Sequence, residues 1–547
     1  MKKIILILLL ASQAAQAQKL KKADKQTIQH LRNHISYLAD DKLEGRRAGT
    51  EGEKLATAYI ISQFNAIGIQ PRGDKGGFEQ TFDIQDGKQI LPGTRLMVNK
   101  QALNPGTDFF PLAYSPNSPL IEANLSPSLA ESGQPWFKDL GDLLLNNKDN
   151  PHYDLQAQVR QELKNAREKG ATALVLFNSS SIQDPLRFDD KDKSEPAPIP
   201  VIYVQKQAMD KYFPDLSAAY DMRLQIETGA KTREARNIVG YIDNGANTTV
   251  VLGAHFDHLG YGEDGNSMLR TGEKLVHNGA DDNASGTAAL IELGRRLKSS
   301  KAKKHNYLLL AFSGEELGLF GSKYYVEHPV IPASQVNFMV NMDMVGRLND
   351  SSKTITIGGY GTSPSWSSLL SSIPNPGFSI KYDSSGTGPS DHTSFYRKDI
   401  PVLFFFTGLH SDYHRPSDDA GKINYHGELL IVKYIQALVE KADGGQKLAF
   451  TKTREQQTST SARFSVSMGI MPDYTFSGNG VKVDGVSENR PAIKAGIKAG
   501  DVVTKLGDFP INSVEGYMQA LSKFKKGDAT KVVVKRGSEE FIFDIVF

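Results

Sequence analysis

The chain of 547 residues contains no cysteine. The protein therefore has no disulfide, no thiolate metal ligand, no thiol nucleophile and no cysteine that could carry a lipid anchor behind an amino-terminal leader. Any metal site must be built from His, Asp and Glu, a donor set that suits zinc or another divalent metal in a hydrolytic role.

An excess of charge of one sign is also missing. The sequence has 64 Lys and Arg residues against 62 Asp and Glu residues, a formal net charge of +2. This balance gives no sign of a nucleic-acid partner or of a polyacidic tail. The remaining composition, with 39% hydrophobic residues, 49 Gly and 25 Pro, is that of an ordinary globular protein, and the length favours three or four domains.

Long apolar runs are absent beyond the first residues. Residues 1–17, MKKIILILLLASQAAQA, combine two lysines, an apolar run from Ile4 to Ala11 and small residues that end at Ala17. The apolar run is far shorter than the roughly 20 residues needed to span a bilayer, so a membrane-spanning first helix is the weaker interpretation. The layout predicts a signal peptide cleaved near Ala17, export to the periplasm or the medium, and no membrane span.

Apolar strands and amphipathic helices alternate over residues 231–442. The predicted strands are 249–254, 307–312, 336–342 and 401–406, and the predicted helices are 284–297, 319–326, 365–373 and 428–441. Continuous apolar strands alternating with helices predict an α/β fold with a mostly parallel sheet that is covered by helices on both faces. Ligands of such sheets bind at the carboxyl ends of the strands.

Changes in composition predict further domains. Residues 112–230 are rich in Pro, Ser and Asn and contain predicted strands at 173–177 and 200–204, which indicates a small β-rich α+β domain inserted between the two parts of the catalytic domain, 18–111 and 231–442. The polar residues 443–463 predict a linker. Short strands and turns over residues 464–547 predict a separate β domain.

Acidic and imidazole side chains follow the predicted strands where each strand ends. They are His255 and Asp257, Glu315 and Glu316, Asp343, the loop residues Tyr413 and His414, and Asp281 and Asp282 in the glycine-rich loop 278–286. Each residue alone fits a helix cap or a solvated helix start. Together they would form an acidic cluster at one rim, which is costly unless cations neutralise it, so the pattern predicts a metal centre.

Six ordered motifs carry a family resemblance. The series GAHFDH, GADDNASG, SGEELGLFGS, NMDMVG, SDHTSF and YHRPSDD resembles the di-zinc aminopeptidase family, which also includes glutamate carboxypeptidases and glutaminyl cyclases. The segment ISYLADDKLEGRRAGTEGE is similar to the amino-terminal part of that family. The resemblance implies the zinc exopeptidase fold and two Zn²⁺ per chain.

The resemblance also implies a role for each site residue. The family's bridging ligand lies three residues before the Ser of a Ser-Gly pair, which here is Ser285, so Asp282 rather than Asp281 would bridge the two metals. The implied partners are His255 and Asp343 in one site and Glu316 and His414 in the other, with Glu315 as general base, Asp257 orienting His255, and Tyr413 donating to the tetrahedral intermediate. Asp391 and His392 match a family motif without an implied direct role.

The two accessory domains have resemblances of their own. GATALVLFNSS and PIPVIYV in the insertion are similar to a protease-associated domain, which would act as a lid or a substrate-recruiting surface. SMGI and GVKVDGVSENRPAIKAGIKAGDVVTKLGD resemble a PDZ domain. The implied partner is an extended peptide or a chain carboxyl terminus at the PDZ groove.

These expectations lead to an exported di-zinc exopeptidase that removes amino-terminal residues from peptides. The bare acidic cluster suits a free α-ammonium, whereas a substrate carboxylate would call for an arginine clamp. Arg347 and Arg415 are the only arginines that adjoin the ligand strands and loops, and either of them acting as a clamp would overturn this assignment. A glutaminyl cyclase or a carboxypeptidase of the same fold, or a PDZ adaptor with a vestigial catalytic domain, remain the alternatives.

Overall fold

The computed structural model describes residues 20–547 apart from 149, 151–152, 193, 270, 272, 445, 454–465, 473–475, 477, 487–489, 513, 522 and 526. The expected signal peptide, residues 1–17, lies outside the described residues. Within the described part of the chain, no helix has both the length and the apolar character needed to cross a membrane. The chain forms two compact units, Met1–Ile84 with Glu234–Ser461 and Gln85–Arg233 with Ala462–Phe547.

A nine-stranded mixed sheet forms the centre of the first unit, with the strand order β1-β11-β13-β12-β14-β17-β15-β16 and β2 paired to β11. The strands are β1 (Gln70–Pro71), β2 (Glu79–Ile90), β11 (Thr228–Ile242), β12 (Thr249–His255), β13 (Asn306–Phe312), β14 (Val336–Met342), β15 (Thr354–Gly358), β16 (Ser379–Tyr382) and β17 (Val402–Phe406). The neighbours β13, β12, β14 and β17 are parallel, whereas β11 and β15 join them antiparallel. The predicted parallel strands are therefore confirmed as the centre of the sheet.

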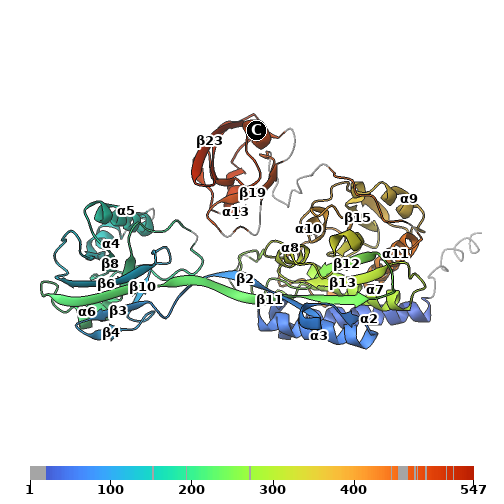
Figure 1. The fold of residues 1–547 in the computed structure, drawn as a ribbon, viewed down its shortest axis with the longest axis horizontal. Helices are drawn as coiled ribbons and strands as arrows, with labels where there is room; N and C mark the ends of the chain where they lie inside the picture. Colours follow the sequence, from blue (N-terminus) through green and yellow to red (C-terminus); the bar gives the residue numbers. More distant parts are fainter. Residues whose placement is uncertain are drawn as a thin grey trace, which may run out of the picture. The chain divides into compact units, whose positions relative to one another are not determined.

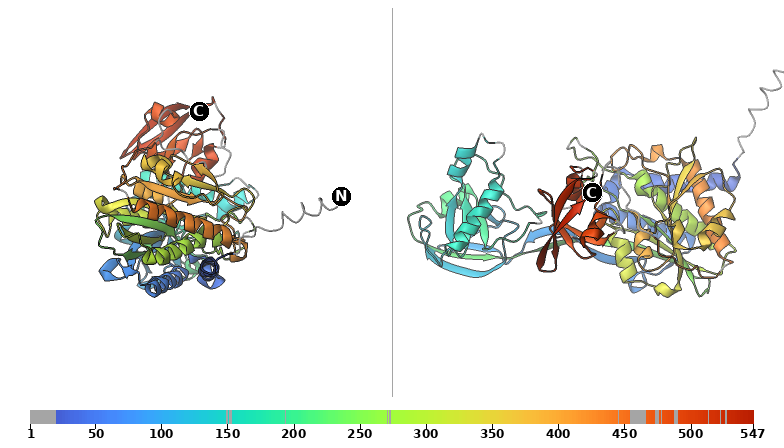
Figure 2. Two further views of the ribbon diagram at one scale, coloured as in Figure 1. Left: turned by 90° about the vertical axis from the view of Figure 1, so that its right-hand side faces the viewer. Right: turned by 90° about the horizontal axis from the view of Figure 1, so that it is seen from above.

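Helices cover both faces of this sheet (Figures 1 and 2). Those on one face are α2 (Lys22–Leu38), α3 (Glu51–Ile67), α7 (Gly286–Ser299), α9 (Ser365–Ser371) and α11 (Tyr425–Ala442), and those on the other are α8 (Phe320–Glu327) and α10 (His392–Tyr396). Successive side chains of β12 point to opposite faces of the sheet. Val250 and Leu252 belong to the core on the side of α7, whereas Val251 packs with Tyr325 and Phe395 on the other side. This alternation explains why the buried strands are apolar throughout.

The insertion in the second unit contains two four-stranded sheets, ordered β4-β3-β10-β6 and β5-β9-β8-β7. Its strands are β3 (Arg95–Val98), β4 (Gln101–Leu103), β5 (Phe109–Pro111), β6 (Ser118–Leu125), β7 (Trp136–Asp139), β8 (Leu174–Phe177), β9 (Val201–Val204) and β10 (Tyr220–Ile226). Its helices are α4 (Gly141–Asn147), α5 (Leu155–Glu168) and α6 (Lys206–Tyr212). The insertion is thus a small α+β domain as expected, while its protease-associated character stays a prediction.

The insertion begins earlier than the sequence predicted. Its unit covers Gln85–Arg233, whereas the composition predicted residues 112–230. The reason is that β3 pairs with both β4 and β10, so residues before position 112 already belong to the sheet of the insertion. Those first strands have no unusual composition, and the two long strands β2 and β11 continue across the division between the units.

The polar stretch 443–463 is not free of contacts in its described part. Leu448 donates its backbone N–H to Asn337 Oδ1 at 2.8 Å, Phe450 packs on Tyr396, and the N–H of Thr451 donates to the carbonyl of Thr362 at 2.8 Å. Residues up to Thr453 therefore belong to the catalytic unit. A few apolar residues among polar neighbours are sufficient for this docking.

The carboxy-terminal residues form a six-stranded sheet, ordered β18-β19-β20-β22-β23 with β21 paired to β20. The strands are β18 (Ile470–Pro472), β19 (Val481–Val486), β20 (Val502–Leu506), β21 (Phe509–Pro510), β22 (Ala529–Arg536) and β23 (Glu539–Val546), with helices α12 (Pro491–Ala495) and α13 (Val514–Leu521). Every pairing is antiparallel, and a core that includes Val483, Val503 and Val534 fills the domain. A separate β domain was expected here, and it is present.

Candidate active site

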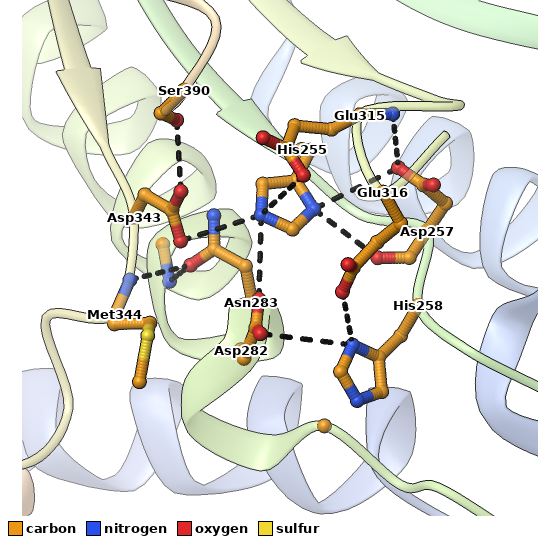
Figure 3. A network of polar contacts seen from close by, with 12 residues as sticks. His255, Asp257, His258, Asp282, Asn283, Glu315, Glu316, Asp343, Met344 and Ser390 are labelled. Carbon is orange, nitrogen blue, oxygen red and sulfur yellow. Dashed lines mark hydrogen bonds and ion pairs between the residues drawn. The ribbon is translucent and has the colours of Figure 1, made fainter. Parts of the chain in front are cut away.

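The predicted site residues meet at the carboxyl ends of the parallel strands. His255 is the last residue of β12, Glu315 and Glu316 follow β13, and Asp343 follows β14. The three strands run side by side in register, so their ends lie at one edge of the sheet. Figure 3 shows these side chains turned toward one another around His255.

The first group of donors surrounds His255. Its Nε2 atom lies 3.4 Å from Asp282 Oδ1 and 3.3 Å from Asp343 Oδ1. Its Nδ1 atom lies 3.2 Å from the carbonyl oxygen of Asp257 and 3.7 Å from the Asp257 carboxylate. The carbonyl accepts a hydrogen bond from Nδ1–H, and this contact directs Nε2 at the two carboxylates.

The second group shares Asp282. The other oxygen of this carboxylate, Oδ2, lies 3.4 Å from Nε2 of His414, and Glu316 Oε2 lies 3.2 Å from the same nitrogen. His414 donates from Nδ1 to the carbonyl of Asn266 at 2.9 Å, which again directs Nε2 into the cluster. Asp282 therefore lies between two imidazoles.

These distances fit metal ligands better than hydrogen-bond partners. Donor atoms at about 2.0–2.1 Å from a tetrahedral Zn²⁺ lie roughly 3.3–3.4 Å apart, and the four donor separations at His255 and His414 are 3.2–3.4 Å. Nε2 of His255 is buried and has no hydrogen-bond partner. Among the described residues, the groups that could hold a metal ion are His255 with Asp282 and Asp343, and His258 with Asp282 and Glu316.

The loop that carries Asp282 is fixed from two sides. Asp418 Oδ2 accepts the backbone N–H groups of Asp281 at 2.9 Å and Asp282 at 3.1 Å. Asn283 donates to the carbonyl of Met342 at 3.0 Å and accepts from the N–H of Met344 at 3.2 Å, so it links the loop to the residues on either side of Asp343. The loop and the end of β14 thus form one polar network.

His258 and Asp418 are buried residues of the site to which the sequence assigned no role. His258 Nδ1 lies 2.7 Å from Glu316 Oε1, where it holds the carboxylate beside His414. Both residues stand inside quoted motifs, His258 at the end of GAHFDH and Asp418 within YHRPSDD. Their position in those motifs was the available signal, but neither occupies a spacing that identifies a ligand.

The pKa values of the adjacent residues Glu315 and Glu316 are shifted in opposite directions. Burial raises the pKa of Glu315 well above its usual range, opposed by His255 and reinforced by Glu316. Burial acts the same way on Glu316, but His414 and His258 outweigh it and hold the pKa of Glu316 well below its usual range. Glu315 Oε2 lies 3.9 Å from His255 Nε2, while its backbone N–H donates to Asp257 Oδ1 at 3.2 Å. Glu315 is thus next to the donor groups without joining either.

Tyr413 lies beside the cluster, with its ring stacked on His414 at a centroid distance of 3.9 Å. Burial and the surrounding carboxylates, Asp282 first among them, raise the pKa of its phenol, which therefore stays a neutral hydrogen-bond donor. The motif that contains Asp391 and His392 reaches the site through Ser390, whose hydroxyl donates to Asp343 Oδ2 at 2.8 Å. His392 instead stacks on Phe404.

The arginines that could have bound a substrate carboxylate have other environments. Arg347 pairs with Asp412 at 3.1 Å and lies 3.8 Å from Asp418. Arg415 is exposed in the loop after β17. The described residues around the donor groups thus leave the cluster predominantly acidic.

Comparisons with known proteins agree with this architecture. The family model for peptidase family M28 matches residues 237–439, and the model for the PDZ domain matches residues 440–546. Aminopeptidase YwaD of Bacillus subtilis is 27% identical over 417 residues, covering 72% of this chain and 80% of the relative. Leupeptin-inactivating enzyme 1 of Streptomyces exfoliatus is 32% identical over 171 residues, covering 29% of this chain and 37% of the relative.

Among solved structures, a zinc aminopeptidase from Bacillus subtilis aligns with a TM-score of 0.42 at 20% identity, covering 77% of this chain and 95% of that chain. The matched M28 segment contains all the proposed metal donors, and the PDZ segment follows it directly. The chain therefore contains a peptidase family M28 domain over residues 237–439, followed by a carboxy-terminal PDZ domain.

Proposed function

We propose that this protein is an exported aminopeptidase that removes amino-terminal residues from peptides with two zinc ions bound at Asp282. The observation that carries the proposal is the position of Asp282, whose two oxygens each lie 3.4 Å from a different imidazole, His255 and His414. The aminopeptidase relatives support this reaction class, and the amino-terminal leader supports export.

The metal ligands proposed for one ion are His255, Asp282 and Asp343, and those for the other are Asp282, Glu316 and His414. When bound, such a pair of cations would polarise the scissile carbonyl, acidify a water molecule and stabilise the developing oxyanion. His258 supports the second set, because it holds Glu316 through Oε1 and leaves Oε2 toward His414.

Glu315 is the proposed general base. Its side chain is 11% exposed and its Oε2 lies 3.9 Å from His255 Nε2. Its raised pKa suits a group that accepts a proton and then releases it. In the proposed sequence Glu315 takes the proton of the attacking water and delivers it to the departing amine. Asp257 holds the His255 imidazole in its orientation, and the neutral Tyr413 phenol donates a hydrogen bond to the tetrahedral intermediate.

The charge of the cluster supports action at the amino terminus. A free α-ammonium is attracted by the acidic groups, whereas a substrate carboxylate would be repelled unless an arginine received it. Arg347 already pairs with Asp412, which makes it less available as such a clamp. The PDZ domain is proposed to hold an extended peptide or a chain carboxyl terminus at its sheet edge.

The test uses the full chain and a panel of related peptides, each assayed with and without a chelator. The panel contains a free peptide, its amino-terminally acetylated copy, its carboxy-terminally amidated copy and a copy that begins with glutamine. The proposal expects chelator-sensitive release of the first residue from every peptide except the acetylated one. Shortening of the acetylated copy from its carboxyl end would indicate a carboxypeptidase, and ring closure on the glutamine peptide without hydrolysis of the others would indicate a cyclase.

A further inference from the structure

The segment Gly45–Arg47, from the EGRRAGT part of the amino-terminal motif, runs beside the residues that follow β12. Arg47 forms an isolated parallel bridge with His258, and the N–H groups of His258 and Gly260 donate to the carbonyls of Arg46 at 3.2 Å and Gly45 at 3.1 Å. Gly45 has φ +65°, and a Cβ there would lie 2.5 Å from the carbonyl oxygen of His277. The close approach of this segment to the site thus depends on glycine.

Arg46 in this segment is completely buried. Its guanidinium donates to four backbone carbonyls, those of Phe256 at 2.7 Å, Asn278 at 2.7 Å, Gly279 at 3.0 Å and Leu38. Burial lowers the pKa of Arg46 to about 10, against the opposing effect of Asp257 and other carboxylates, so the group is a cation at neutral pH. Burying a cation among neutral carbonyls is costly, which calls for a reason beyond packing.

The four carbonyls show what Arg46 joins. Phe256 stands between His255 and Asp257, while Asn278 and Gly279 begin the loop that leads to Asp282. These two segments are held by one rigid, planar fork of N–H groups. Arg46 therefore links the segment that carries His255 to the loop that carries Asp282 through backbone carbonyls.

Arg47 makes an equivalent connection to the other donor group. It pairs with Asp264 through two hydrogen bonds of 2.7 Å, one to each carboxylate oxygen. Two residues later in the same loop, the carbonyl of Asn266 accepts from His414 Nδ1 at 2.9 Å, and the N–H of Met268 donates to the carbonyl of His414 at 2.9 Å. Arg47 thus fixes the loop that directs the His414 imidazole.

We propose that Arg46 and Arg47 are positioning residues for the metal centre, with Arg46 setting the separation of His255 and Asp282 and Arg47 setting the orientation of His414. The consequence for catalysis rests on the proposed function. The consequence for metal binding and for the two loops does not require that the substrate be a peptide.

The experiment uses full-length wild-type protein and the variants Arg46→Gln, Arg46→Lys and Arg47→Gln. Asn306→Ala is the matched structural control, because Asn306 is also buried and its side chain joins backbone groups of Asn244 and Ala246, but at the start of β13, the end opposite the site. The readouts are metal affinity by chelator competition, the visible spectrum of the cobalt-loaded protein, kcat and KM on an aminoacyl anilide, the thermal midpoint, and amide hydrogen exchange of residues 255–260 and 277–283.

We expect Arg46→Gln to bind metal about 10–100-fold more weakly, as loss of a residue that supports metal ligands typically does. The visible spectrum of its cobalt-loaded form should change, and amide hydrogen exchange of residues 255–260 and 277–283 should become faster. Its kcat should fall, while KM should stay nearly unchanged. Arg46→Lys should lie between this variant and the wild type, since one ammonium cannot replace the fork. Arg47→Gln should bind only one of the two metal equivalents more weakly. Asn306→Ala should lower the thermal midpoint without altering metal affinity, the cobalt spectrum or kcat.

A folded Arg46→Gln with wild-type metal affinity, spectrum and exchange would overturn the inference for Arg46. If that variant does not fold, wild-type values for Arg46→Lys overturn it instead. Unchanged metal binding in Arg47→Gln overturns the role of Arg47. Failure of the proposed function would give a different result, because the wild-type protein would then leave every aminoacyl substrate intact. Hydrogen exchange of the metal-free variants would still show whether Arg46 holds the two loops.

Discussion

The neighbouring residues Asp281 and Asp282 direct their carboxylates to different parts of the protein. Asp282 lies between His255 and His414, whereas Asp281 accepts from Ser285 Oγ at 3.0 Å and from the N–H of Gly346 at 2.7 Å. One carboxylate is thus available to metal ions, while its neighbour holds the loop to the chain after β14. Two identical side chains in sequence therefore have separable roles.

We predict that wild-type protein purified without chelator contains about two equivalents of divalent metal, and that Asp282→Ala loses most of both because each site loses a ligand. Asp281→Asn is the matched control. It should retain the metal and lose thermal stability instead, since its contacts are structural. Metal analysis of the three proteins is the measurement. A stable and active wild-type enzyme with one equivalent, or an Asp282→Ala protein with both, would contradict the bridging assignment.

The adjacent glutamates give a second comparison. Glu315→Gln should keep both metals and the fold but lower kcat by about 10²–10⁴-fold, because the amide has nearly the same shape and cannot accept the proton of water. Glu316→Gln should lose metal from one site, since Oε2 is a proposed ligand. Metal content and kcat are measured on the same preparations. Near-normal turnover by a metal-loaded Glu315→Gln protein would show that the base is another residue.

Removal of the PDZ domain should leave the hydrolysis of small amides nearly intact, because every proposed catalytic residue precedes it. The structure sets the end of the shortened chain at Thr453 rather than at Lys441, since Leu448, Phe450 and Thr451 pack on the catalytic unit. Rates on a dipeptide and on a long peptide are compared with those of the full chain. A shortened protein that folds and binds metal but fails on the dipeptide would mean that the PDZ domain completes the active site.

His34 predicts loss of stability in mild acid. Burial, with smaller effects of Arg295 and His30, lowers the pKa of this imidazole from 6.5 to about 3. Below about pH 6.5 the His34 imidazole is protonated in the unfolded chain but stays neutral in the folded protein. The free energy of unfolding therefore falls by up to about 1.4 kcal/mol for each unit by which the pH is lowered. The contribution is fully present above pH 6.5 and decreases toward pH 3.

The control for this prediction is His34→Gln, which can still bond the Tyr59 hydroxyl that now lies 2.8 Å from Nδ1 but does not titrate. Between about pH 6.5 and pH 5 the wild type should lose on the order of 2 kcal/mol more stability than the variant. Urea unfolding of the metal-free proteins measures the difference. The prediction would be refuted if the free energy of unfolding changed with pH in the same way for the two proteins.

The central strands and the main site residues could be predicted from the sequence because both depend on local patterns. Four uninterrupted apolar runs became the parallel strands β12, β13, β14 and β17, since a strand buried on both faces must be apolar at every position. The polar residues that end three of these strands had to meet at one edge. The family resemblance implied Asp282 rather than Asp281 as the bridging residue, and Asp282 lies 3.4 Å from each of the two imidazoles.

Only the tertiary structure decided how those residues are held. His258, Asp418 and Arg46 act through backbone groups or neighbouring carboxylates that are distant in the chain, and no local pattern encodes a contact between residues 46 and 279. The start of the insertion escaped prediction for the same reason, because the strand pairing of β3 with β10 joins residues more than a hundred positions apart. The sequence by itself determined which chemistry the strand ends carry, since residue type and strand period are local. Their distances and orientations were decided by folding, since these depend on hydrogen bonds and packing between segments that meet only in three dimensions.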